Sequence, residues 1–79
     1  MFRYLLMQER LTNPELGAYE TFGIRIVDGT NAEIRVISDI SLDQNVVLQL
    51  CENCNLLELD PIHIDDLIED LFAWLAKTP

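Results

Sequence analysis

The chain has few basic residues: five lysines and arginines stand against fourteen aspartates and glutamates in 79 residues, which gives a formal net charge of −9. A protein that binds phosphate backbones without sequence preference uses lysine and arginine to replace counterions, so this composition argues against that class. Hydrophobic residues make up 49% of the chain, which is typical of a folded domain. The charge favours a basic protein as partner.

Long apolar runs are also missing, so the sequence offers no membrane-spanning helix. The segment from Met1 to Glu9 lacks the cleavage pattern of a signal peptide. We therefore expect a cytoplasmic protein, and in that reducing compartment its two cysteines are expected to be thiols. The length predicts a single small domain over residues 1–79.

Three strand-like segments come first, and they cover Phe2 to Gln8, Ala18 to Val27 and Glu33 to Ser38. Asp28-Gly29-Thr30-Asn31 is a hairpin turn signal between the second and the third. Gly23, inside a strand, predicts a bulge or a close backbone approach.

Two helices follow the strands. The first is expected to begin at Ser41, which forms a capping box with Gln44, and to end near Asn55. The predicted fold class is α+β: a three-stranded antiparallel sheet followed by two helices packed on one face.

Alternation divides the side chains of the sheet between two faces. The face expected to meet the helices carries Tyr4, Leu6, Phe22, Ile24, Ile26, Ile34 and Val36. The opposite face mixes arginine with apolar residues, namely Arg3, Leu5, Met7, Tyr19, Arg25, Val27, Arg35 and Ile37. Since nothing covers this second face, we predict that the protein forms homo-oligomers through it or through a sheet edge.

The segment Asp60–Pro79 is predicted to form one amphipathic helix, with Asp60 as N-cap and Pro61 at the first helical position. Its apolar arc consists of Ile64, Leu67, Ile68, Leu71, Phe72, Trp74 and Leu75. Its opposite side carries acids, namely Asp65, Asp66, Glu69 and Asp70. This acidic side is either a solvated face that keeps the protein soluble or a surface that binds a partner.

The two cysteines, Cys51 and Cys54, precede His63 by twelve and nine residues. A zinc site would need a fourth ligand, which Asp60 could supply. The helical period, however, places Cys54 in the middle of an apolar face, which favours buried thiols that fill the core. We therefore expect no cofactor, and zinc held by Cys51, Cys54 and His63 is the alternative.

No catalytic constellation is visible in the sequence. Catalytic carboxylates need contrasting environments to separate their pKa values, whereas the four acids of the last helix share one wet face. The sequence has neither an EF-hand loop nor a phosphate-binding glycine loop. We expect a non-enzymatic protein.

Four motifs in order resemble a family of short uncharacterised proteins from Firmicutes, a domain of unknown function: Tyr19-Glu-Thr-Phe-Gly-Ile, Ser38-Asp-Ile-Ser-Leu-Asp, Leu50-Cys-Glu-Asn-Cys-Asn and Leu59-Asp-Pro-Ile-His-Ile-Asp-Asp-Leu-Ile-Glu-Asp-Leu. The resemblance covers Arg3 to Leu71 and implies a bacterial cytoplasmic protein without an assigned activity. The family pattern matches at Gly23, Asp39, Ser41, Cys54, Asn55, His63, Glu69 and Asp70. Of these, the resemblance implies a site made by Cys54, Asn55, His63, Glu69 and Asp70, whereas Cys51 lies outside the pattern.

Three functional hypotheses follow. The first is a non-enzymatic interaction domain that binds a protein partner through Asp65, Asp66, Glu69, Asp70, Arg3, Arg25, Arg35 and Tyr19. The second is an acidic regulator that mimics nucleic acid on a basic protein surface. The third is a small metal-binding domain that uses Cys51, Cys54 and His63. None of the three involves direct binding to nucleic acid or to a membrane.

Overall fold

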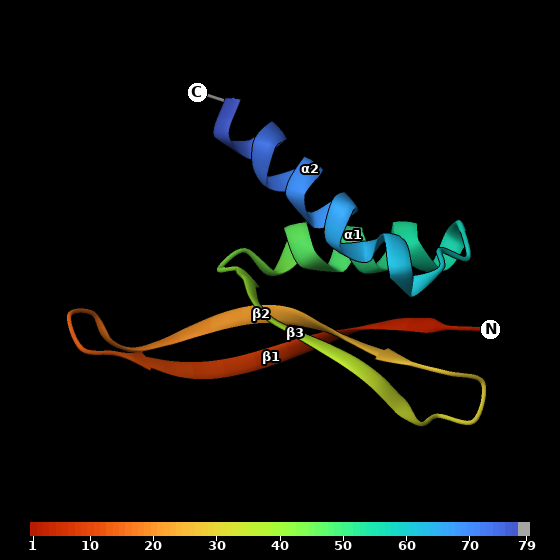
Figure 1. The fold of residues 1–79 in the computed structure, drawn as a ribbon. Helices are drawn as coiled ribbons and strands as arrows, with labels where there is room; N and C mark the ends of the chain where they lie inside the picture. Colours follow the sequence, from red (N-terminus) through yellow and green to blue (C-terminus); the bar gives the residue numbers. More distant parts are fainter. Residues whose placement is uncertain (78–79) are drawn as a thin grey trace.

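The computed structural model describes residues 1–77, so Thr78 and Pro79 of the predicted last helix lie outside the described residues. Three antiparallel strands form one sheet in the order β1-β2-β3, with bounds Arg3–Asn13, Gly17–Val27 and Glu33–Ser41. A helical layer covers one face of this sheet (Figure 1). It consists of α1 (Gln44–Leu56), the 3₁₀ turn η1 (Pro61–His63) and α2 (Ile64–Lys77). The predicted α+β fold is confirmed.

The β1–β2 hairpin is longer than the sequence predicted, because the strands pair without a register shift from Arg3 opposite Val27 to Asn13 opposite Gly17. The Oδ1 atom of Asn13 accepts hydrogen bonds from the backbone N–H of Glu15 and of Leu16, at 2.8 and 3.1 Å. Gly17 has a φ of 77°, which glycine adopts without strain. These contacts close a tight turn between β1 and β2.

The β2–β3 pairing is interrupted by a bulge in β3. Phe22 lies opposite Ser41 and Ile24 opposite Ile37, so β3 carries two extra residues between these pairs. Asp39, in the bulge, has a φ of 54°. A Cβ atom on Gly23 would lie 2.2 Å from the carbonyl oxygen of Ile37. Gly23 therefore permits the close backbone approach that the sequence predicted.

A second irregularity, between Ile26 and Val27, makes the predicted faces of β3 wrong. A shift of one residue moves every following side chain to the other face of the sheet. Ile37 packs against the core instead of lying on the open face. Ile34 and Val36, which we expected to meet the helices, are 45% and 42% exposed.

The core lies between the sheet and two parts of the helical layer, namely α1 and the beginning of α2. Its buried members are Tyr4, Phe22, Ile24, Ile26, Ile40, Val47, Leu50, Cys51, Cys54, Ile64 and Ile68. The buried residues of α1 are Val47, Leu50, Cys51 and Cys54, and the ends of this helix differ from the prediction. Asp43 is the N-cap and accepts from the N–H of Asn45, while Ser41 ends β3. Asn55 lies inside α1, and Leu57 is the C-cap.

Only the beginning of α2 is buried. Asp60 caps η1 as predicted, since its Oδ1 atom accepts from the N–H of Ile62 at 3.1 Å. Ile64 and Ile68 then enter the core, with exposures of 0% and 8%. Beyond them α2 rises away from the sheet (Figure 1). Trp74, in its second half, is 64% exposed. None of the described helices is long and apolar enough to span a membrane.

Candidate functional site

The C-terminal end of α1 is held to β1 by an anchor made of Tyr4, Asn55 and Leu59. The side-chain amide of Asn55 accepts from the N–H of Tyr4 at 2.7 Å and donates to its carbonyl oxygen at 2.9 Å. The hydroxyl of Tyr4 donates to the carbonyl oxygen of Leu59 at 2.6 Å. Burial raises the pKa of this hydroxyl to about 12, and negative charge on Cys54 and Asp60 adds to the shift. Three polar contacts thus fix this end of the helical layer.

Both cysteines lie in the core beside this anchor. Cys51 and Cys54 are 3% and 0% exposed. Burial raises the pKa of Cys51 to about 11 and also raises the pKa of Cys54. Because the thiolate is the reactive form, a raised pKa makes these buried thiols poor nucleophiles at neutral pH. They fill the core, as the helical period predicted.

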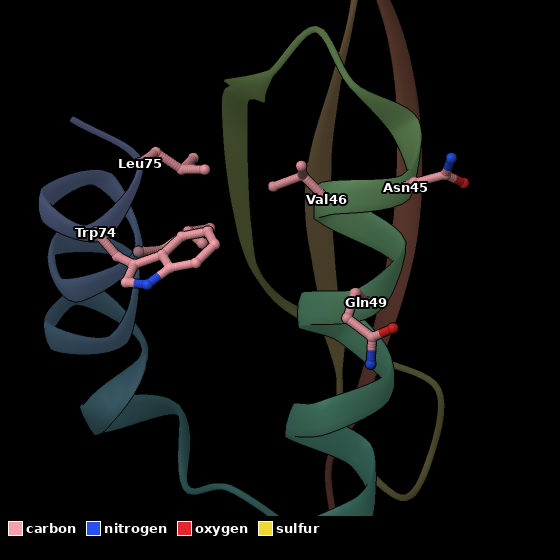
Figure 2. Close-up of a pocket in the computed structure, with 6 residues that line it drawn as sticks. Asn45, Val46, Gln49, Trp74 and Leu75 are labelled. Atoms are coloured by element: carbon pink, nitrogen blue, oxygen red, sulfur yellow. The ribbon is translucent and has the colours of Figure 1, made fainter. Parts of the chain in front are cut away.

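At the opposite end of the helical layer, the start of α1 and the end of α2 diverge and leave an apolar groove of about 290 Å³. Asn45, Val46 and Gln49 of α1 line one side, and Leu71, Trp74 and Leu75 of α2 line the other. Figure 2 shows Val46 pointing across the groove toward Trp74 and Leu75. The exposed lining is almost entirely apolar. The groove can therefore receive an apolar side chain or a short amphipathic segment.

The acids predicted as interaction residues lie along α2, on the side away from the core. Asp65 is engaged within the chain: its carboxylate accepts two hydrogen bonds from Arg35, at 2.6 and 2.9 Å, and this lowers the pKa of Asp65. Among residues 1–77, the exposed side chains of Asp66, Glu69 and Asp70 form no ion pair. These three carboxylates are available on the helix that forms one wall of the groove.

The arginines predicted on the open sheet face are mostly engaged by their own chain. Arg35 does not lie on that face, because it is opposite the buried Ile26 and bonds Asp65 of α2. Arg25 pairs with Glu33 at 2.8 Å, and Arg3 donates to Oδ1 of Asn31. The prediction that arginine gathers on the open face is therefore wrong for Arg35. The side chains of Arg3 and Arg25 are less available to a partner than expected, because Asn31 and Glu33 already bind them.

Tyr19 takes part in a polar network around the β3 bulge. Its hydroxyl donates to Asp39 at 3.1 Å, and the buried hydroxyl of Thr21 donates to the same carboxylate at 2.7 Å. Desolvation and the bond to Asp39 raise the pKa of Tyr19. Glu9 of β1 accepts from Ser38 and from the N–H of Asp39, at 2.7 and 3.0 Å. The network holds the bulge across all three strands.

The structure does not bring together the predicted metal ligands. His63 is exposed on η1, whereas both cysteines are buried. Within the described part of the chain, no group of three or more histidine, cysteine or acidic side chains gathers where it could hold a metal ion. The His63 backbone N–H donates to the carbonyl oxygen of Asp60 at 3.0 Å.

The residues implied by the family resemblance separate into three groups. Gly23, Asp39 and Ser41 build the bulge, since the carbonyl oxygen of Ser41 also accepts from Thr21 at 3.1 Å. Asn55 and Cys54 belong to the anchor and the core. His63, Glu69 and Asp70 are exposed on η1 and α2. The predicted five-residue site is therefore split between a structural anchor and a surface.

Sequence reasoning missed the groove because half of its lining lies on α1. Val47 is fully buried, while its neighbour Val46 lies on the flank of α1 that faces α2. The apolar arc of α2 is wider than the single stripe that the core buries. This excess of apolar residues is the sequence signal that could have indicated the groove. Trp74 lies at the border of that arc.

The chain belongs to the family of unknown function DUF6514, whose sequence profile matches residues 1–73. The resemblance drawn from the four motifs is thereby confirmed at the level of a domain of unknown function. No curated protein and no solved structure matches the chain.

Proposed function

We propose that this protein is a non-enzymatic interaction domain whose groove between α1 and α2 receives an amphipathic helix with basic residues from a partner protein. The observation that supports the proposal is the exposure of apolar residues that the fold itself does not bury. Trp74 is 64% exposed and Phe72 is 45% exposed, on a helix whose earlier apolar residues Ile64 and Ile68 are buried. Exposed apolar surface of this kind commonly marks a protein interface.

The chemistry of the partner follows from the composition of the groove and its border. The lining is apolar, so it favours the apolar stripe of an amphipathic helix. Asp66, Asp70 and Trp74 follow one another at intervals of four residues along α2, so the two carboxylates lie on the same flank of the helix as Trp74. With a chain charge of −9, lysine or arginine beside that stripe would be attracted to this border.

Binding can be measured through the single tryptophan of the chain, Trp74, because it lines the groove. The probe is a synthetic helix with leucine on one face and lysine on the other. Two matched peptides accompany it: one with glutamate in place of lysine, and one of the same composition scrambled so that it is no longer amphipathic. We expect the leucine–lysine helix alone to shift the Trp74 emission, with an affinity that falls as salt rises.

Variants of the protein locate the binding surface. Val46→Lys places a cation in the groove and is expected to weaken binding about tenfold or more. Leu16→Lys makes the same change at the β1–β2 turn, where Leu16 is 76% exposed, and should leave binding unchanged. Asp70→Asn should weaken binding less than Val46→Lys, with Glu15→Gln as its control. Equal binding of the lysine and glutamate peptides, or equal effects of Val46→Lys and Leu16→Lys, would overturn the proposal.

A further inference from the structure

We infer that a second copy of this chain pairs with the free edge of β1, between Leu6 and Arg10, so that two sheets join into one. This surface is separate from the groove, and the inference does not depend on the proposed function. It follows from the direction of backbone groups, from the distribution of charge and from the residues that would face each other.

The edge of β1 presents unpaired backbone groups. The N–H and the carbonyl oxygen of Tyr4 both bond Asn55, so they point away from β2. The β1–β2 register has no shift, and in an antiparallel pair outward and inward backbone groups alternate. The groups of Leu6, Gln8, Arg10 and Thr12 therefore point outward as well. Within residues 1–77 they form no backbone hydrogen bond to a turn or a loop.

The other edge of the sheet is protected. In β3 the bulge at Ser38–Ile40 interrupts the ladder, and Arg35 is held by Asp65 of α2. Bulges and charges are devices that keep an edge strand from pairing with another chain. The eleven residues of β1 contain no such irregularity. Asn55 blocks this edge only at Tyr4, so the rest of it is open to strand pairing.

The charge distribution selects β1 as the place where two acidic chains can meet. The three charged residues of β1 are Arg3, Glu9 and Arg10, so the strand is positive by one charge. By contrast, α2 carries four acids and one base. Because each chain has a net charge of −9, repulsion between two copies is smallest when they approach through β1.

One register avoids contacts between like charges. A two-fold axis that keeps both helical layers on the same side of the joined sheet places Gln8 opposite Gln8 of the second copy. Leu6 then faces Arg10, and Met7 faces Glu9. A shift that centres the pair on Glu9 or on Arg10 would oppose identical charges. A shift centred on Met7 would require the backbone of Tyr4, which Asn55 already occupies.

The same register covers apolar side chains that are exposed in one copy. Leu5, 37% exposed, comes to lie opposite Leu11 of the second copy on the open sheet face. Leu48 of α1 is 38% exposed and lies seven residues before Asn55, so the two share the flank of α1 above the β1 edge. Strand pairing would bring a second α1 beside it. Burial of these leucines adds a hydrophobic contribution to the backbone bonds.

The test places charge at Gln8, whose side chain is exposed, so that folding is preserved. Gln8→Lys and Gln8→Glu each put like charges opposite one another in the homodimer. Sedimentation should show each variant associating about two- to five-fold more weakly than the original chain. An equal mixture of the two variants should recover association, because opposite charges then meet.

The matched control changes the other edge, with Ile34→Lys and Ile34→Glu on β3, and association should not change. Hydrogen exchange of the Leu6, Gln8 and Arg10 amides should slow as the concentration of the original chain rises. A chain that stays monomeric at hundreds of micromolar would overturn the inference. So would association that is unaffected at Gln8, or one that the mixture fails to restore.

Discussion

The two ends of the helical layer meet the rest of the molecule in different ways. At the anchored end, Asn55 and Tyr4 join α1 to β1 through backbone and side-chain bonds, and Ile64 is fully buried. At the groove end, α2 leaves the sheet, and Trp74 remains largely exposed beside Val46. Both ends are rich in apolar residues, but at the groove end the large side chain of Trp74 stays mostly outside the core. We therefore expect the anchored end to contribute more to the stability of the fold than the groove end does.

The strongest test of this contrast compares two substitutions on the same helix. Ile64→Ala removes a side chain that is 0% exposed, and we expect it to lower the free energy of unfolding by about 2–5 kcal/mol. Trp74→Ala removes a larger side chain at a position that is 64% exposed, and the loss should be below about 1 kcal/mol. Urea unfolding followed by circular dichroism measures both, since Trp74→Ala leaves no tryptophan to observe.

Ile64→Val serves as the conservative control at the anchored end, with an expected loss of about 0.5–1.5 kcal/mol. If Trp74→Ala costs as much as Ile64→Ala, the second half of α2 belongs to the core, and the division between the two ends fails.

The second test removes the polar part of the anchor. Asn55→Ala deletes both hydrogen bonds to the backbone of Tyr4, and we expect a loss of about 1–3 kcal/mol. Asn53→Ala, two residues earlier on α1, removes only an exposed side-chain bond to Gln49 and should cost less than about 0.5 kcal/mol. Thermal unfolding of the two variants separates an anchor from a general effect of asparagine in this helix.

Alkaline pH tests the anchor without a substitution. Tyr4 keeps its proton more tightly in the folded chain, where its pKa is about 12, than in the unfolded chain, where the ordinary value is 10.0. The stability from the neutral hydroxyl is therefore complete below pH 10.0 and is lost as the pH rises toward 12. The pKa of Cys51 is likewise raised in the folded chain, from 9.0 to about 11, so its contribution to stability is lost as the pH rises through this range.

We expect the melting temperature to fall over this range, and Tyr4→Phe should flatten the fall because it has no proton to lose. A pH profile of Tyr4→Phe that is as steep as that of the original chain would assign the alkaline transition to the cysteines alone.

Much of the anchored end could be predicted from the sequence, because regular periods govern it. The alternation in β1 and β2 placed Tyr4, Ile24 and Ile26 on the core face, and all three are buried. The helical period likewise placed Cys54 in the core. The long-range bonds of Asn55 could not be predicted, because local rules favour asparagine as a helix end and the partner lies 51 residues away in the sequence.

The groove and the faces of β3 could not be predicted, for a different physical reason. Whether the apolar arc of α2 is buried depends on the angle at which the helix leaves η1, and a periodic pattern does not contain that angle. In β3, the irregularity beside Val27 reverses the alternation, and no residue type there signals it. Gly23 indicated the other bulge, because only glycine tolerates such a close carbonyl. The irregularity beside Val27 is also the reason that the sequence pattern placed Arg35 on the open face, whereas Arg35 lies opposite the buried Ile26.

The smallest expected effect concerns the ion pair between Arg35 of β3 and Asp65 of α2. Among residues 1–77 it is the one ion pair between the sheet and α2. Asp65→Asn should lower the melting temperature less than Asn55→Ala does, since both charged side chains are largely exposed and water screens them. The bond to Arg35 lowers the pKa of Asp65, so its contribution is present above the ordinary value of 3.8 and is lost as the pH falls through the lowered value. Melting temperatures of the original chain and of Asp65→Asn should therefore converge in strong acid and in high salt.

The control is Asp66→Asn, which breaks no ion pair. It should leave the melting temperature unchanged or slightly higher, because it relieves the repulsion between Asp66 and Asp70, one helical turn away.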